Sequence, residues 1–138
     1  MKTFREYLES LDACKSAVMW AGDKTIEQVV AECHRGDWLL WLGQKCGVEL
    51  QPLTLAKGHC ANTVRRLMTD ERSLKAVDMA IAFGEGRATA DELNAAAYAA
   101  AYAAAAADNQ QQTADICRKH IGELIIEKIT QILNPNKP

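Results

Sequence analysis

The 138-residue sequence lacks an excess of basic charge, since 16 lysines and arginines stand against 18 aspartates and glutamates. A surface that binds nucleic acid through its phosphates needs a clear basic excess, and the net charge of −2 offers none. The same charge is too small for a protein that imitates DNA. Nucleic acid is therefore disfavoured as a partner.

The sequence also lacks the marks of secretion and of membrane insertion. The start MKTFREYLES carries charges where a signal peptide would need an apolar segment. The alanine-rich run is too short and too weakly hydrophobic to span a bilayer. An odd number of widely spaced cysteines is typical of reduced thiols in the cytosol; these are Cys14, Cys33, Cys46, Cys60 and Cys117. We expect a cytoplasmic protein with no membrane segment.

Strand signals are nearly absent, because the best candidate, 48–50, is too short and isolated to form a sheet. Helix starts, in contrast, are marked by capping-box pairs; these are Thr3 with Glu6, Thr25 with Gln28 and Thr89 with Glu92. Helix ends are marked by glycines that can adopt the left-handed conformation; these are Gly22, Gly36, Gly47, Gly84 and Gly86. Pro52 suits the first turn of a helix.

These signals predict an all-α chain with one domain over residues 1–138. The expected helices cover 3–20 (with a break near Ser10 left open), 25–34, 37–46, 52–68, 71–83, 89–121 and 122–133. We expect a compact bundle of six to seven helices around a long alanine-rich central helix. Continuity from Thr89 through Gln110 to Gln112 is favoured by helical phase, while a break there stays open, and Gly122 could interrupt or merely kink the helix.

The alanine-rich segment 94–109 has eleven alanines in sixteen residues. Alanine has the highest helix propensity, and a helix clad in methyl groups lets neighbouring backbones approach closely. We expect a thin buried helix anchored by Tyr98 and Tyr102. An ice-binding face would require regularly repeated threonines, and a coiled-coil seam would require large residues at the a and d positions. The segment lacks both features.

Two other stretches are rich in large apolar residues. GDWLLWLGQKCG predicts a short buried helix capped by Asp37, with an exposed aromatic anchor for a partner as the alternative. The last segment carries Ile121, Leu124, Ile125, Ile126, Ile129, Ile132 and Leu133. These residues cover a wider arc than one core contact requires, so either two helices clamp the segment or its edge, including Ile126 and Leu133, binds a partner.

No set of residues predicts a reaction. Cys33-His34, His59-Cys60 and the pair Cys117/His120 supply metal-ligand types, but adjacent helical residues diverge too much to converge on one ion. Cys60 with His59, or Cys117 with His120, could form a nucleophilic pair, yet no third orienting residue is evident. We therefore expect no metal, no cofactor and no catalytic residue, and a protein that is not an enzyme.

The most basic part of the chain lies around Arg65 and Arg66 on the predicted helix 52–68. A solvated helix face explains these charges most simply. The alternative is a contact with an acidic partner, and a protein is preferred to nucleic acid because no aromatic residues interleave with the arginines.

The order of these features resembles that of a known family. GDWLLWL is followed by TVRRLMTDERSLKAVDMAIAFGEGRATADEL, AAAYAAAYAAAAA and ADICRKHI. This set is similar to the alanine-rich immunity-protein family that is encoded beside polymorphic bacterial toxins and in phage genomes. It covers roughly residues 21–121 and leaves the last helix outside.

The resemblance implies a small helical inhibitor that acts by binding a protein. It would neutralise a toxin or, in a phage, block a host defence component. The alternative is a structural or assembly module of phage or mobile-element origin that self-associates through the last helix. The expected partner-binding residues are Arg65, Arg66, Ile126 and Leu133.

Overall fold

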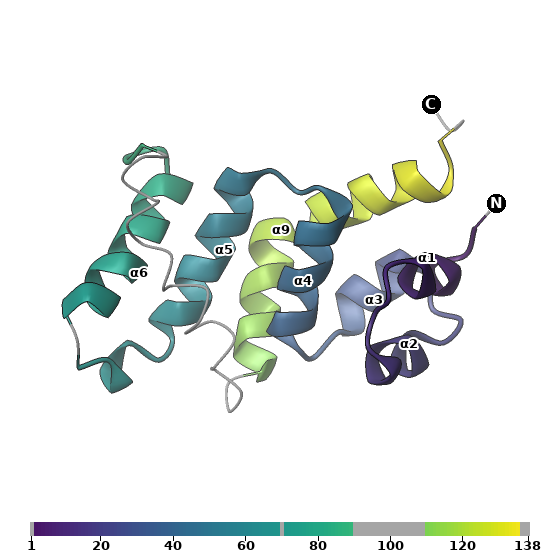
Figure 1. Cartoon of the computed structure of the whole chain (residues 1–138), viewed down its shortest axis with the longest axis horizontal. Coiled ribbons are helices and arrows are strands. Elements are labelled where there is room, and N and C mark those ends of the chain that lie inside the picture. Colours follow the sequence, from purple (N-terminus) through teal and green to yellow (C-terminus); the bar gives the residue numbers. More distant parts are fainter. Residues whose placement is uncertain (1, 70, 90–109, 136–138) are drawn as a thin grey trace.

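The computed structural model describes residues 2–69, 71–89 and 110–135 (Figure 1). In these ranges the regular structure is helical throughout, with no strand, which confirms the all-α class. The helices are α1 (Phe4–Ser10), α2 (Lys15–Ala21), α3 (Ile26–Glu32), α4 (Gly36–Cys46), α5 (Leu50–Asn62), the 3-10 turn η1 (Arg65–Leu67), α6 (Glu71–Gly84) and α9 (Gln110–Leu133). The alanine-rich segment with Tyr98 and Tyr102 lies outside the described residues, as does the predicted continuity from Thr89 to Gln110.

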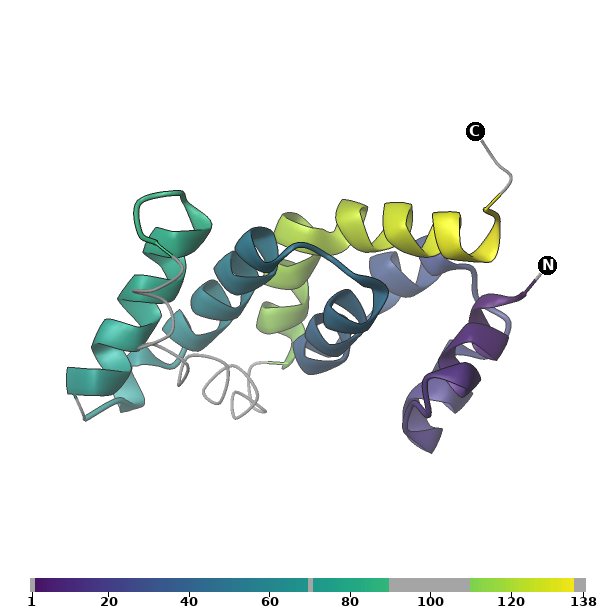
Figure 2. The ribbon, with the colours of Figure 1, turned by 45° about the horizontal axis from the view of Figure 1, so that its top comes forward.

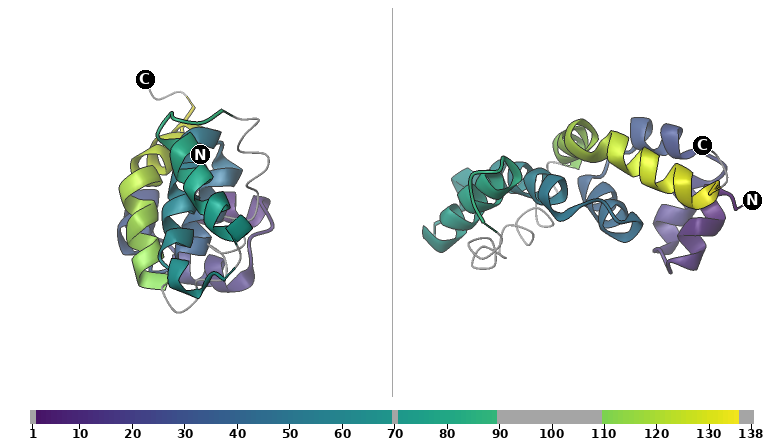
Figure 3. Two further views of the ribbon diagram at one scale, coloured as in Figure 1. Left: turned by 90° about the vertical axis from the view of Figure 1, so that its left-hand side faces the viewer. Right: turned by 90° about the horizontal axis from the view of Figure 1, so that it is seen from above.

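The helices are arranged in a row along the long axis of the molecule (Figure 1). α6 lies at one end and packs on α5. The middle is formed by α4 and α9, and the other end by α1, α2 and α3. Seen from above, α9 runs from beside α5 toward the end formed by α1, α2 and α3, with α4 on one flank and α3 on the other (Figure 3). α9 contacts α3, α4 and α5 and thus connects α5 to that end of the molecule.

Two of the predicted helix starts have the expected geometry. Thr3 and Thr25 each accept a hydrogen bond from the backbone of the residue three positions later, and Glu6 and Gln28 complete the capping boxes. The third pair, at Thr89, extends beyond the described residues. These caps fix where α1 and α3 begin.

The break near Ser10 that was left open in the helix expected over 3–20 is present: α1 ends at Ser10, and the chain turns between Leu11 and Cys14 with Asp12 at a φ of 56°. Other predicted boundaries are wrong. The helix expected over 52–68 begins at Leu50, ends at Asn62 and is followed by η1. Gly22 and Gly47 do cap α2 and α4 with positive φ.

Gly36 was expected to end a helix and instead begins α4. A Cβ at this position would lie 2.7 Å from the backbone carbonyl carbon of Thr113 on α9, so only glycine allows the two helices to meet there. Gly84 has the same role at the contact of α6 with α5, where a Cβ would lie 2.7 Å from the Cα of Leu55. Glycines thus provide, at these contacts, the close backbone approach that was expected from the alanines.

α9 continues through Gly122, so of the two alternatives left open there, an interruption or a kink, the interruption is excluded. The helix changes direction near its middle (Figure 2), as helices often do at glycine. Gly122 is buried, and a Cβ there would lie 3.1 Å from Val30 on α3. The residue therefore serves the packing of α9 on α3.

The buried apolar residues form two clusters. The larger one joins α1, α3, α4, α5 and α9, and Leu39, Ile121, Ile125 and Ile129 are among its most deeply buried side chains. The smaller one lies between α5 and α6 and comprises Ala61, Val64, Met68, Val77 and Ala80. None of the helices in the described ranges is long and apolar enough to cross a membrane.

Candidate functional site

A cleft of about 430 Å³ opens between the α1–α2 pair and α4. This volume lies in the range of pockets that bind small molecules or side chains of a partner. Its lining is mostly apolar: Phe4, Leu8, Ala13, Ala17, Trp20, Ala21, Val29, Trp38, Leu39, Trp41 and Leu42, with Asp12, Cys14, Cys33 and Asp37. All three tryptophans of the chain line it, and we call it the tryptophan cleft.

Two of the tryptophans, Trp20 and Trp38, belong to an aromatic cluster. Trp20 of α2 and Trp38 of α4 lie 6.0 Å apart between ring centroids, and His34 contacts both rings edge-on. Lys24 lies 4.8 Å from the ring centroid of Trp20, and Arg35 lies 4.5 Å from that of Trp38. These cation–π contacts fix the ring planes, while the indoles remain half-buried and accessible.

Two carboxylates lie among the apolar residues of the cleft. Asp37 accepts two hydrogen bonds from the Arg35 guanidinium, at 3.2 and 2.8 Å. Asp37 was expected to cap α4, but the N-cap is Arg35 and Asp37 lies in the first turn. Asp12 is exposed. Because Asp37 already has a cation, Asp12 is the carboxylate of the lining best placed to receive a positive charge from a ligand.

Arg65 and Arg66 lie on η1, where α5 leads into α6. The Arg65 guanidinium pairs with Asp78 at 2.9 and 3.0 Å and contacts Asn62 at 3.1 Å. Arg66 is exposed and donates to the Thr63 carbonyl at 2.9 Å. Arg66 is therefore more available to a partner than Arg65, whose charge is compensated by Asp78.

The other two predicted partner residues lie on the second half of α9, which runs away from α5 and α6 toward the opposite end of the molecule (Figure 1). Ile126 and Leu133 are partly buried and pack against the larger core, whereas Ile132 is 45% exposed. Ile121, Ile125 and Ile129 are fully buried, so the predicted clamping of this segment by neighbouring helices accounts for most of its apolar arc. The structure does not bring Ile126 and Leu133 together with Arg65 and Arg66.

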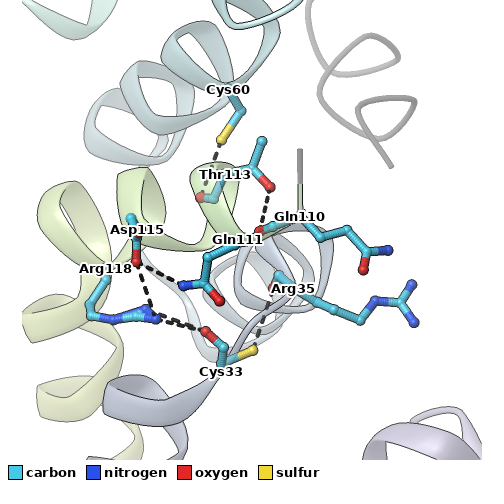
Figure 4. Close-up of polar contacts among 8 residues, drawn as sticks. All are labelled: Cys33, Arg35, Cys60, Gln110, Gln111, Thr113, Asp115 and Arg118. Atoms are coloured by element: carbon cyan, nitrogen blue, oxygen red, sulfur yellow. Dashed lines mark hydrogen bonds and ion pairs between the residues drawn. The ribbon is translucent and has the colours of Figure 1, made fainter. Parts of the chain in front are cut away.

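The cysteines that were considered as nucleophiles are buried in the contact between α5 and α9. The Sγ atoms of Cys60 and Cys117 lie 3.7 Å apart, and Cys60 also donates to the Thr113 carbonyl at 3.7 Å (Figure 4). The hydrogen bond with Cys60 and burial raise the pKa of the Cys117 thiol. A fully buried thiol with a raised pKa is a poor nucleophile.

The histidines next to these cysteines have a different environment. His59 and His120 stack on each other, with ring centroids 4.8 Å apart and planes at 10°. They line a polar depression of about 440 Å³ together with Asn62, Thr63, Gln112, Ile116 and Lys119. Across residues 2–69, 71–89 and 110–135, no group of three or more His, Cys, Asp or Glu side chains is placed to hold a metal ion.

Arg118 has a structural role that the sequence did not reveal. Its guanidinium donates two hydrogen bonds, at 3.3 and 2.7 Å, to the carbonyl of Cys33, the C-cap of α3 (Figure 4). Asp115 contacts the same guanidinium at 3.7 Å and accepts from Gln111 at 3.1 Å. This network fixes the end of α3 on α9 and thereby positions Arg35 and the wall of the tryptophan cleft.

Comparison with known proteins adds no relative: no family model, curated protein or solved structure matches the chain. The resemblance to the alanine-rich immunity-protein family thus depends on the ordered motifs alone.

Proposed function

We propose that the protein is a non-enzymatic inhibitor that binds another protein in the cytoplasm, with the tryptophan cleft as its main point of attachment. The supporting observation is the concentration of Trp20, Trp38 and Trp41 around one open apolar cavity. Tryptophan is enriched among the residues that dominate binding energy at interfaces. Inhibition would consist of covering the partner's functional surface, for which about 800 Å² per partner suffices.

The chemistry of the cleft favours a partner segment with an apolar side chain next to a lysine or arginine. The apolar side chain would enter between α2 and α4, where full burial contributes about 1.5–3 kcal/mol. The cation would pair with Asp12 at the exposed edge. The resemblance to immunity proteins suggests that the partner is a toxin or, in a phage, a host defence component.

The exposed Arg66 would add a second contact only for a partner that extends along the molecule to η1. Arg65 would support it indirectly, since its pairing with Asp78 holds the turn in place. Ile126 and Leu133 would contribute by fixing the surface from which Ile132 projects.

The proposal is tested by affinity capture with the wild-type protein and with Trp38→Ala, in cells that carry the neighbouring genes. We expect the wild type to retain a partner that Trp38→Ala loses, because truncation of a central tryptophan typically costs 2 kcal/mol or more. Lys45→Ala, which changes an exposed lysine of α4 outside the cleft lining, is the matched control. Capture of no partner would contradict inhibition, and equal capture by Trp38→Ala would remove the cleft from the interface.

A second candidate function, self-association through the C-terminal helix, is favoured by one observation. Leu50 and Ile132 are 56% and 45% exposed, and the Glu49–Lys128 ion pair of 2.9 Å links their two helices. Ile132→Glu is a sharper test than Ile126→Glu or Leu133→Glu, because Ile126 and Leu133 also pack on the core. Light scattering that shows a dimer for the wild type and a monomer for Ile132→Glu would favour this function; an unchanged mass would exclude it.

A further inference from the structure

The polar depression between the end of α5 and the first half of α9 has the composition of an anion site. The described residues that line it carry two imidazoles, one ammonium group, two amides and one hydroxyl, and none of these described residues is a carboxylate. Lys119 and Gln112 form no hydrogen bond or ion pair within the described parts of the chain, so their donors are free for a ligand. The amide oxygen of Asn62 is already occupied by Arg65.

Electrostatics around the stacked histidines also favours a negative ligand. The pKa of His120 is lowered by burial and by its neighbours His59 and Lys119, so protonation of His120 is opposed unless a negative charge lies nearby. Glu85 is an acidic residue that interacts with His59. The pKa of Glu85 is lowered mainly by the hydrogen bond from Arg87 and less by His59. Arg87 therefore already compensates Glu85.

We propose that the depression formed by His59, His120, Lys119 and Gln112 binds a doubly charged phosphate group, either as free phosphate or as the phosphate of a mononucleotide. Donors that reach the cavity from two helices suit a tetrahedral oxyanion, which accepts hydrogen bonds in several directions. The volume of about 440 Å³ exceeds what a phosphate ion needs and is in the range for a small organic ligand. Ile116 and an imidazole face provide apolar and flat surfaces for a base.

The test is calorimetric titration of the whole protein with inorganic phosphate and with adenosine monophosphate, at neutral pH and constant ionic strength. We expect saturable binding of at least one, and a rise of the His120 titration midpoint in proton NMR when the ligand is present. Tighter binding of adenosine monophosphate would assign a nucleotide. Equal binding of the two would assign free phosphate.

Lys119→Gln should weaken binding about tenfold, as expected for the loss of one charge-assisted hydrogen bond. Lys119 is exposed, so this variant is expected to fold, and Lys45→Gln on α4 is the matched control. His120→Gln should also weaken binding, with circular dichroism used to confirm that its helices are intact.

Three results would overturn the proposal. These are the absence of saturable binding to either probe, full retention of binding by both Lys119→Gln and His120→Gln, and binding restricted to single-stranded RNA with a steep salt dependence. The last result would indicate recognition of a nucleic-acid backbone rather than of a mononucleotide.

Discussion

At the scale of single residues, glycine is the residue on which the helix packing depends most. The contact of Gly36 with Thr113 brings two backbones together, and a methyl group at Gly36 would overlap atoms that cannot rotate away. We predict that Gly36→Ala lowers the free energy of unfolding by about 1–3 kcal/mol, the usual cost of overpacking. Urea denaturation followed by circular dichroism measures this loss.

Gly43 provides the matched control for that prediction. A Cβ there would approach the Cδ1 atoms of Ile121, Leu53 and Ile125, at 3.2, 3.3 and 3.7 Å, and these side-chain ends can shift. The higher helix propensity of alanine offsets part of the strain, so Gly43→Ala should cost less than Gly36→Ala. The reverse order would contradict the packing account.

His120 is expected to make stability depend on pH. Burial, His59 and Lys119 lower its pKa from the ordinary value of 6.5. Well above pH 6.5, His120 is neutral in both the folded and the unfolded protein. As the pH falls below 6.5, the unfolded chain takes up a proton that the folded chain resists, so folding stability decreases. Urea midpoints at about pH 5.5 and 7.5 measure the decrease, and His120→Gln should reduce it. An equal decrease in both proteins would show that His120 does not cause it.

At the scale of helices, the residues at which helices begin could be predicted from the sequence better than those at which helices end. The capping boxes at Thr3 and Thr25 are local, since every atom involved lies within four residues, and both are present. The end of α5 at Asn62 has no such signal. The chain turns there because Val64 and Met68 reach the small core against α6, a contact that only the folded chain creates.

The cap of α3 allows a direct test of this local control. The Thr25 hydroxyl accepts from the Gln28 backbone at 3.2 Å, and Thr25 is exposed, so its replacement removes little besides the cap. We predict that Thr25→Ala lowers the free energy of unfolding by about 0.5–2 kcal/mol. Thr25→Ser should retain most of the wild-type stability, because serine also caps helices well. Thermal unfolding of both variants checks this, and an equal loss in each would argue against capping.

At the scale of the whole molecule, the candidate sites could be predicted only in part. Trp38 and Trp41 were considered as an aromatic anchor, but Trp20 joins them from α2, which α3 separates from α4 along the chain. Likewise, the histidines of α5 and α9 stack although 61 positions separate His59 from His120 in the sequence. Sequence periodicity reports the face of one helix, whereas a cleft requires the register between helices.

The division of the core into two clusters predicts unequal stability along the molecule. α6 has α5 as its main described neighbour, and the cluster between them is much smaller than the one around α9. Regions with fewer buried apolar contacts open first, so amide hydrogens of α6 should exchange faster than those of α4 and of the second half of α9. Hydrogen exchange followed by mass spectrometry measures this order.

Val77→Ala sharpens the test, because Val77 is fully buried at the centre of the smaller cluster. The cavity should cost about 1–3 kcal/mol. If α6 opens as a separate unit, this loss appears as faster exchange in α6 and the end of α5, while exchange around Ile125 in α9 stays at the wild-type rate. Uniform acceleration across all helices would instead mean that the two clusters unfold together, because α5, which contributes to both, would then transmit the loss from α6 to α9.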